Sequence, residues 1–277
     1  MAKKQFFLFV IIRCKLVAFL YFYKMIKITI IGSGNVAQHL INAFANAQNI
    51  ELFQVFARNR ADVSHLINPN KIVSDYNDLL ESDLFIIAVS DNVIQEVSSQ
   101  IPFTNKLVAH TSGNFSIDDL DSKIRKAVFY PLQTFSKNKE VNFQEIPICL
   151  ETQNESDYQI LEKVANSISY KIYKINSEQR KSLHVSAVFV CNFVNHLYEI
   201  GNDICNENQV DFEILKPLIQ ETANKVLSLS PNEAQTGPAK RGDSQTINEH
   251  LKFLKNENQI GIYKLLTKSI IDNGKKL

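Results

Sequence analysis

The sequence predicts an α/β fold in which a doubly wound, mostly parallel sheet is followed by an all-helical C-terminal domain. Three observations predict it: a glycine turn between a strand and a helix near residue 32, an alternation of short apolar runs with amphipathic segments up to about residue 175, and long helical segments after that. Such alternation is typical of parallel strands covered by helices on both faces. We therefore expect an N-terminal extension at 1–24, an α/β domain at 25–175 and a helical domain at 176–277.

Length and charge limit the classes of protein that need to be considered. A chain of 277 residues is long enough for two domains, and a formal charge of +1 argues against a nucleic-acid-binding protein, with no basic face for phosphates beyond the local cluster at Arg58. The four cysteines show neither metal-site nor disulfide spacing: Cys14, Cys149, Cys191 and Cys205. We therefore expect no metal, reduced thiols and a cytoplasmic protein.

Residues 1–24 contain two apolar runs, 6–12 and 16–23, separated by Arg13 and Lys15. Neither run is long enough to span a bilayer, and no small-x-small cleavage site precedes the first strand. We expect the folded protein to begin near Met25 and residues 1–24 to be an upstream extension, or the product of a start codon assigned too early, with no stable membrane association. A membrane-tethering helix is the alternative.

The first predicted strand, 27–31, runs into a glycine turn that opens a helix. Gly32 permits the tight turn, Gly34 lets backbone N–H groups approach a pyrophosphate, and the small Ala37 allows close packing of helix on strand. The phosphates would lie at the helix N-terminus. This pattern predicts a dinucleotide site, with an ordinary strand-turn-helix corner as the alternative; its cofactor-binding residues are Gly32, Ser33, Gly34, Asn35 and Val36.

The end of the second strand indicates which dinucleotide is bound. An acidic residue about twenty positions after the glycine turn would bind the ribose 2′-hydroxyl of NAD, whereas an arginine accommodates the 2′-phosphate of NADP. Arg58 and Asn59 stand there, followed by Arg60. They favour NADP over NAD, although a solvated basic turn would look the same.

Polar residues follow two further buried strands, where ligands of open α/β sheets bind. Val89 ends the run 84–89 and Ser90 follows it, while His110 ends the run 106–110 and Ser112 comes two residues later. We expect these four residues at the nicotinamide end, although Ser112 could instead cap a helix and His110 could be a buried core histidine. The predicted strands are 27–31, 51–57, 71–73, 84–89, 106–110, 126–130, 146–150 and 171–175.

A long helix is predicted from Ser177 to about Asn206. At 100° per residue, Lys181, His184 and Asn195 share one face, with Asn192 at its margin. Polar groups amid apolar neighbours commonly mark a cleft, and buried structural hydrogen bonding is the alternative. In the later loop 229–243, Asp243 is placed to cap the next helix, while Arg241 suits either a substrate carboxylate or a salt bridge.

The order of these motifs resembles the Rossmann-like proteins that carry a C-terminal domain of unknown function 2520 (DUF2520). The matching pieces are IGSGNVA at 31–37, AVSD at 88–91, HTSG at 110–113, YPLQTFS at 130–136, LHVSAVFVCNF at 183–193 and QTGPAKRGD at 235–243. More distantly the chain is similar to pyrroline-5-carboxylate reductase, ketopantoate reductase, β-hydroxyacid dehydrogenases and deazaflavin-dependent NADP oxidoreductases. The resemblance implies a Rossmann-type domain, a helical domain like the C-terminal domain of 6-phosphogluconate dehydrogenase, and a homodimer formed through that helical domain.

The resemblance also implies an oxidoreductase that transfers a hydride to or from a small, carboxylate-bearing metabolite. Hydroxyacid and ketopantoate enzymes carry a lysine and an asparagine one turn apart, but the residue four after Lys181 is Val185. His184 would therefore be the acid/base, with Asn192 and Asn195 orienting the substrate, and Lys181 and Arg241 binding it. A non-catalytic NADP-binding sensor or scaffold is the alternative.

Overall fold

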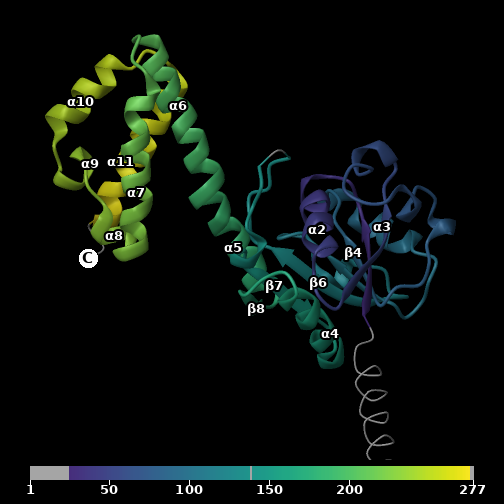
Figure 1. Ribbon diagram of the computed structural model, residues 1–277. Helices are drawn as coiled ribbons and strands as arrows, with labels where there is room; N and C mark the ends of the chain where they lie inside the picture. The colour runs from purple at the N-terminus through teal and green to yellow at the C-terminus, as the bar shows by residue number, and fades with distance from the viewer. Residues whose placement is uncertain (1–24, 138, 275–277) are drawn as a thin grey trace, which may run out of the picture. The chain divides into compact units, whose positions relative to one another are not determined.

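The computed structural model describes residues 25–137 and 139–274 of the chain (Figure 1). The predicted extension at 1–24 lies outside the described residues. Contacts within the chain divide it into two compact units between Val188 and Phe189. The first unit contains one eight-stranded sheet, whose strands are β1 (Ile26–Ile31), β2 (Ile50–Phe56), β3 (Ile72–Val73), β4 (Leu84–Ile87), β5 (Leu107–His110), β6 (Arg125–Pro131), β7 (Ile148–Thr152) and β8 (Ile172–Lys174).

The strand order confirms the predicted doubly wound sheet. It runs β3-β2-β1-β4-β5-β6-β7-β8, so the chain crosses from β3 back over β1 to β4. All neighbouring strands are parallel except β6 and β7, which pair antiparallel. The carboxyl ends of β1 and β4 are therefore adjacent at the point where the winding reverses, which is where open α/β sheets bind ligands.

Alternate side chains of the central strands form two separate cores, one on each face of the sheet. In β4, Leu84 and Ile86 belong to a cluster with the apolar residues of two helices, α2 (Asn35–Ala45) and α4 (Glu155–Asn166). Phe85 and Ile87 belong to a second cluster, with Ile94 of α3 (Ile94–Gln100). Because successive side chains of a strand point to opposite faces, a strand that is apolar throughout must be covered on both sides.

The predicted helix from residue 177 to about 206 is interrupted. The structure has α5 (Ser177–Ala187), a π-helical segment at Val188–Phe193, and α6 (Val194–Glu207). A π-helical turn adds residues per turn, so the 100° spacing used to place Asn195 on the face of His184 does not hold across it. The predicted domain boundary at 175/176 precedes α5, whereas the two compact units divide inside the π-helical segment.

The second unit consists of helices (Figure 1). After α6, those of the described residues are α7 (Lys216–Ser228), α8 (Pro231–Ala234), α9 (Pro238–Arg241), α10 (Ser244–Phe253) and α11 (Glu257–Gly274), with a short 3-10 turn at Phe212–Leu215. Asp243 caps α10, as predicted, because its carboxylate accepts the Thr246 N–H at 3.1 Å. Within the described part of the chain, no helix has the length and apolar character needed to cross a membrane.

Candidate functional site

The first position of the glycine corner between β1 and α2 must be a glycine for steric reasons. Gly32 has φ of +140°, and a Cβ there would lie 2.1 Å from the carbonyl oxygen of Ala88 on the neighbouring strand. The Gly32 N–H donates to the Phe56 carbonyl at 2.9 Å, which ties the corner to β2. No residue with a side chain could keep this close approach of β1 to β4.

The second glycine leaves space above the corner. A Cβ on Gly34 would meet nothing within 4 Å. Gly34 is also the N-cap of α2, and no side chain caps this end, nor does an acidic residue stand in its first turn. The free N–H groups and the positive end of the helix dipole are therefore available to an anion.

A cleft of about 640 Å³ opens over this corner. Its wall contains eight of the residues predicted to bind the cofactor: Gly32, Ser33, Gly34, Asn35, Val36, Arg58, Val89 and Ser90. The wall also contains Thr111, Gln133 and Phe135. Other wall residues were not predicted from the sequence, among them Phe56, Tyr76, Glu96 and Gln100. The Tyr76 ring stacks on Phe56 at 4.2 Å between centroids, which gives the cleft a flat aromatic side.

The two arginines after β2 have different roles. Arg60 donates to the Pro69 carbonyl at 2.8 Å and so stabilises its own loop. Arg58 is exposed and lies on the cleft wall, where its charge acts on the neighbouring Tyr76. Burial and the Glu96 carboxylate raise the pKa of Tyr76, and the Arg58 guanidinium opposes this shift. Asn59 turns away from the cleft wall to cap the next turn, accepting the Ala61 N–H at 3.2 Å.

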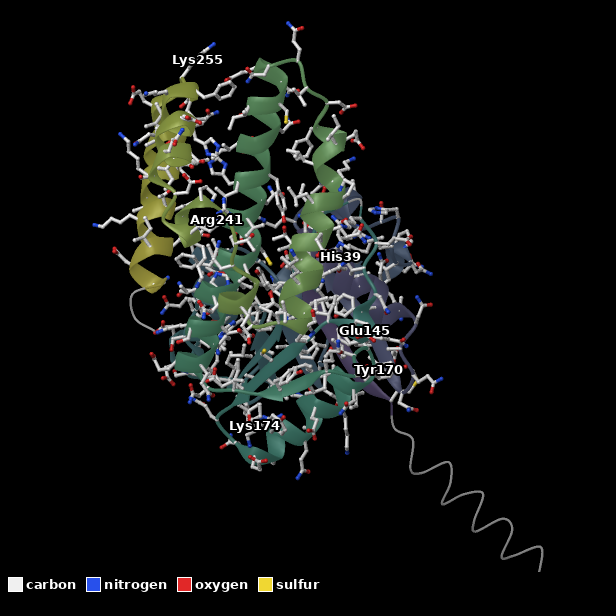
Figure 2. The ribbon with its side chains drawn as sticks, turned by 90° about the vertical axis from the view of Figure 1, so that its left-hand side faces the viewer. His39, Glu145, Tyr170, Lys174, Arg241 and Lys255 are labelled. Atoms are coloured by element: carbon white, nitrogen blue, oxygen red, sulfur yellow. The ribbon has the colours of Figure 1, made fainter. Side chains whose placement is uncertain are left out.

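The loop after β6 is fastened across the start of α2. The Asn35 side chain donates to the Phe135 carbonyl at 3.1 Å, and His39, labelled in Figure 2, contacts the Ser136 carbonyl through Nε2 at 3.0 Å. The His39 and Phe135 rings lie 4.9 Å apart. These contacts bring Gln133 and Phe135 to the cleft. The wall is therefore built from two segments that lie about one hundred residues apart in the sequence.

His110 and Ser112 do not line the cleft. His110 is fully buried, and its Nδ1 accepts the Ser112 N–H at 3.2 Å. Burial lowers the pKa of His110 to about 3, and the Arg180 charge acts in the same direction, so the ring is neutral at pH 7. The Ser112 hydroxyl accepts the Asn114 and Phe115 N–H groups, so it stabilises the turn after β5. His110 therefore has the core position named above as its alternative, whereas Ser112 caps a turn and not a helix.

His184 on α5 lies against the end of β6 and the turn that follows β5. Its Nδ1 lies 3.0 Å from the Tyr130 hydroxyl at the end of β6, and its ring packs against Gly113. The loop that carries Gly113 also supplies Thr111 to the cleft wall, and the loop that follows β6 supplies Gln133. Three separate motifs, HTSG, YPLQTFS and LHVS, therefore converge within the first unit.

A buried arginine that the sequence analysis missed fixes α5. Arg180 is fully buried and forms an ion pair with Glu151 of β7, and it donates to the Phe115 carbonyl at 2.5 Å. Lys181, predicted to bind substrate, is half-exposed and lies 3.6 Å from Glu178. The signal for Arg180 was weak, because a buried arginine cannot be told from an exposed one without its partner.

The remaining predicted residues belong to the second unit. Asn192 lies in the π-helical segment and Asn195 on α6, both exposed, and Arg241 is exposed at the end of α9 (Figure 2). These three residues belong to the second compact unit, whereas His184 belongs to the first. Among the described residues, no group of three or more His, Cys, Asp or Glu side chains could hold a metal ion.

Comparison with known proteins identifies two family models. The domain of unknown function DUF2520 matches residues 146–270, and the coenzyme F420-dependent NADP oxidoreductase family matches residues 27–112. No match was found among curated proteins.

Solved structures match almost the whole chain. A proposed NADP oxidoreductase from Bacteroides fragilis is 34% identical, with a TM-score of 0.80, over 89% of this chain and 98% of that one. Protein TM1727 from Thermotoga maritima is 21% identical with a TM-score of 0.69, over 90% and 98% of the two chains. NADP-bound pyrroline carboxylate reductase from Plasmodium falciparum shares the fold at 16% identity, with a TM-score of 0.57, over 91% and 97%. The chain therefore belongs to the family of Rossmann-like oxidoreductases that carry the DUF2520 domain.

Proposed function

We propose that this protein is an NADP-dependent oxidoreductase that transfers a hydride to or from a small, carboxylate-bearing metabolite. The observation that carries the proposal is the 640 Å³ cleft over a glycine corner whose helix N-terminus has no capping side chain. Such a corner suits a pyrophosphate, because the backbone amides can approach it closely and the helix dipole favours negative charge.

In this proposal, the wall of the cleft holds the dinucleotide along its length. The pyrophosphate lies against Ser33, Gly34 and the first turn of α2, where a Cβ on Gly34 would meet open space. Arg58 takes the 2′-phosphate, since its guanidinium lies on the cleft wall while Arg60 is engaged with the Pro69 carbonyl. Val89 and Ser90, at the carboxyl end of β4, lie at the nicotinamide end together with Thr111.

Hydride chemistry belongs to the nicotinamide when it is bound. His184, on α5, supplies or removes the proton at the substrate oxygen or nitrogen. Its half-exposed ring is held in place by the contact with Tyr130 of β6. Lys181 and Arg241 bind the substrate carboxylate, and Asn192 and Asn195 orient it. Arg241, Asn192 and Asn195 belong to the helical unit, and their roles are proposed from the sequence pattern.

Calorimetric titration with NADP and NAD tests the nucleotide assignment. We expect tighter binding of NADP than NAD, and Arg58→Ala should weaken NADP binding about tenfold or more, about 1.4 kcal/mol, with little effect on NAD. Arg60→Ala is the matched control, because that guanidinium bonds within its own loop. Equal affinities for both nucleotides in the parent protein and in Arg58→Ala would refute the NADP preference. Absence of binding by either nucleotide would refute the function.

A non-catalytic nucleotide sensor is the second candidate. It is favoured by Val185, which stands where related enzymes carry an asparagine, and by the contact of Lys181 with Glu178. Screening small keto and imino acids against NADPH absorbance separates the two functions. An enzyme should oxidise NADPH with one of them, and His184→Ala should abolish this turnover while leaving NADP affinity unchanged.

We also propose that the protein is a homodimer formed through its helical unit. Among the described residues 189–274, only Gln259 is buried, so this unit has almost no core of its own. Large apolar side chains are exposed on several of its helices, including Ile214, Leu218, Leu227 and Leu265. Helices with exposed apolar faces usually bury them against another surface, and a second copy supplies a self-complementary one.

A further inference from the structure

The contact between Tyr130 and His184 joins residues 54 positions apart. The Tyr130 hydroxyl lies 3.0 Å from Nδ1 of His184, and the two rings meet at 69° with their centroids 6.1 Å apart. Tyr130 is buried in β6, whose backbone pairs with Cys149 of β7. The hydroxyl is therefore fixed by the sheet, and it contacts Nδ1.

Gly113 makes room for this contact. A Cβ at position 113 would lie 2.5 Å from Nδ1 of His184 and 2.9 Å from Cζ of Tyr130. Real Cβ atoms do not approach other atoms so closely, so any larger residue must push the two rings apart. The backbone of the HTSG turn thus packs against both partners of the hydrogen bond.

The helix that carries His184 is fixed as well. Arg180, one turn earlier on α5, is fully buried and is paired with Glu151 of β7. Its guanidinium also donates to the Phe115 carbonyl, two residues after Gly113. The imidazole is thereby held by α5, by Tyr130 of β6 and by the turn that contains Gly113, all within one compact unit. Its ring remains half-exposed.

We propose that Tyr130 is the positioning residue of His184: the Nδ1–H of His184 donates to the Tyr130 oxygen, so Nε2 is the nitrogen that exchanges a proton with substrate. The proposal rests on the acid/base role given to His184 in the proposed function. The hydrogen bond made by one ring nitrogen determines the protonation of the other.

The proton balance is the same in both directions. When a carbonyl or imine is reduced, the carbon receives the hydride and its electron pair, and the oxygen or nitrogen receives the proton from Nε2 of the imidazolium. The neutral ring that remains keeps its proton at Nδ1, on the Tyr130 oxygen. In oxidation the lone pair at Nε2 accepts the proton, and the contact with Tyr130 is unchanged.

The imidazole nitrogens can be observed directly by NMR of protein labelled with ¹⁵N-histidine. An unconstrained neutral histidine prefers the Nε2–H tautomer, so the proposal predicts the less common one. At a pH where His184 is neutral, we expect the Nδ1–H form in the parent protein and predominance of the Nε2–H form in Tyr130→Phe. Tyr170→Phe is the control, because Tyr170 is 73% exposed, and the signals of His39 and His65 should be the same in all proteins.

Gly113→Ala is a second variant that changes the geometry without removing the hydroxyl. It should also shift His184 toward the Nε2–H tautomer. A parent protein with His184 in the Nε2–H form, or a tautomer unchanged in Tyr130→Phe, would overturn the proposal. These spectra require neither substrate nor cofactor, so they are independent of the proposed function. If a substrate is found, Tyr130→Phe should lower kcat at least tenfold and leave the KM for NADPH within twofold.

Discussion

His110 ends β5 with a fully buried ring, although the strand points to the rim of the sheet. A histidine after an apolar run is equally consistent with a ligand contact and with a core position. The structure places it in the core, where Nδ1 accepts the Ser112 N–H of the turn that follows. Thr111, its neighbour, lies on the cleft wall instead. A difference of one residue therefore separates a core side chain from one on the cleft wall.

Burial of His110 predicts a pH-dependent stability. Its pKa of about 3 in the folded protein lies below the ordinary value of 6.5, so between these values the unfolded chain binds a proton that the folded protein does not. Stability is therefore fully present above pH 6.5 and is lost as the pH falls toward 3. The free energy of unfolding should drop by about 1.6 kcal/mol from this group between pH 6.5 and pH 5.

Urea unfolding of the parent protein and His110→Asn at several pH values measures this contribution. The variant keeps an acceptor near Nδ1 and should show a flatter pH dependence. His65→Asn, at an exposed histidine, should follow the parent protein. Parallel pH curves for the parent and His110→Asn would contradict the prediction.

At the scale of elements, α5 depends on the buried pair between Arg180 and Glu151. A buried arginine is stable only while its charge is paired, and removal of its partner leaves an uncompensated charge. We expect Glu151→Ala to reduce the free energy of unfolding by about 3 kcal/mol. Arg180 also donates to the Phe115 carbonyl, so the loss should loosen the turn beside His184 as well.

The pair of Glu145 with Lys171 provides the matched control for this experiment. Both of its side chains are exposed, with Glu145 labelled in Figure 2, so Glu145→Ala should change the free energy of unfolding by less than about 1 kcal/mol. Thermal or urea unfolding of the two variants measures the difference. Equal effects in both would show that burial of the Arg180 pair contributes nothing.

At the scale of the whole molecule, the two units differ in how they bury apolar surface. The first unit buries apolar clusters on both faces of its sheet, whereas the described part of the second leaves nearly every apolar residue at least partly exposed. We expect sedimentation of the protein at micromolar concentration to show a dimer. Leu218→Glu with Leu265→Glu should convert it to a monomer, because a charge on a buried interface is costly.

Leu80→Glu is the control for dimer formation, since Leu80 is comparably exposed but belongs to the first unit. It should leave the mass in solution unchanged. A monomeric parent protein, or a dimer that survives both helix substitutions, would refute the assignment of the dimer to the helical unit.

The sequence by itself determined the doubly wound sheet, the glycine corner and the change to helices, because these depend on local periodicity and on backbone conformations that few residues can adopt. Only the tertiary structure decided which polar residues face the cleft. Arg58 and Arg60 are alike in sequence, yet one lies on the cleft wall and the other bonds to Pro69. Tyr130 and His184 meet because β6 and α5 pack together. This contact joins segments far apart in the sequence, so it cannot be predicted from a local sequence pattern.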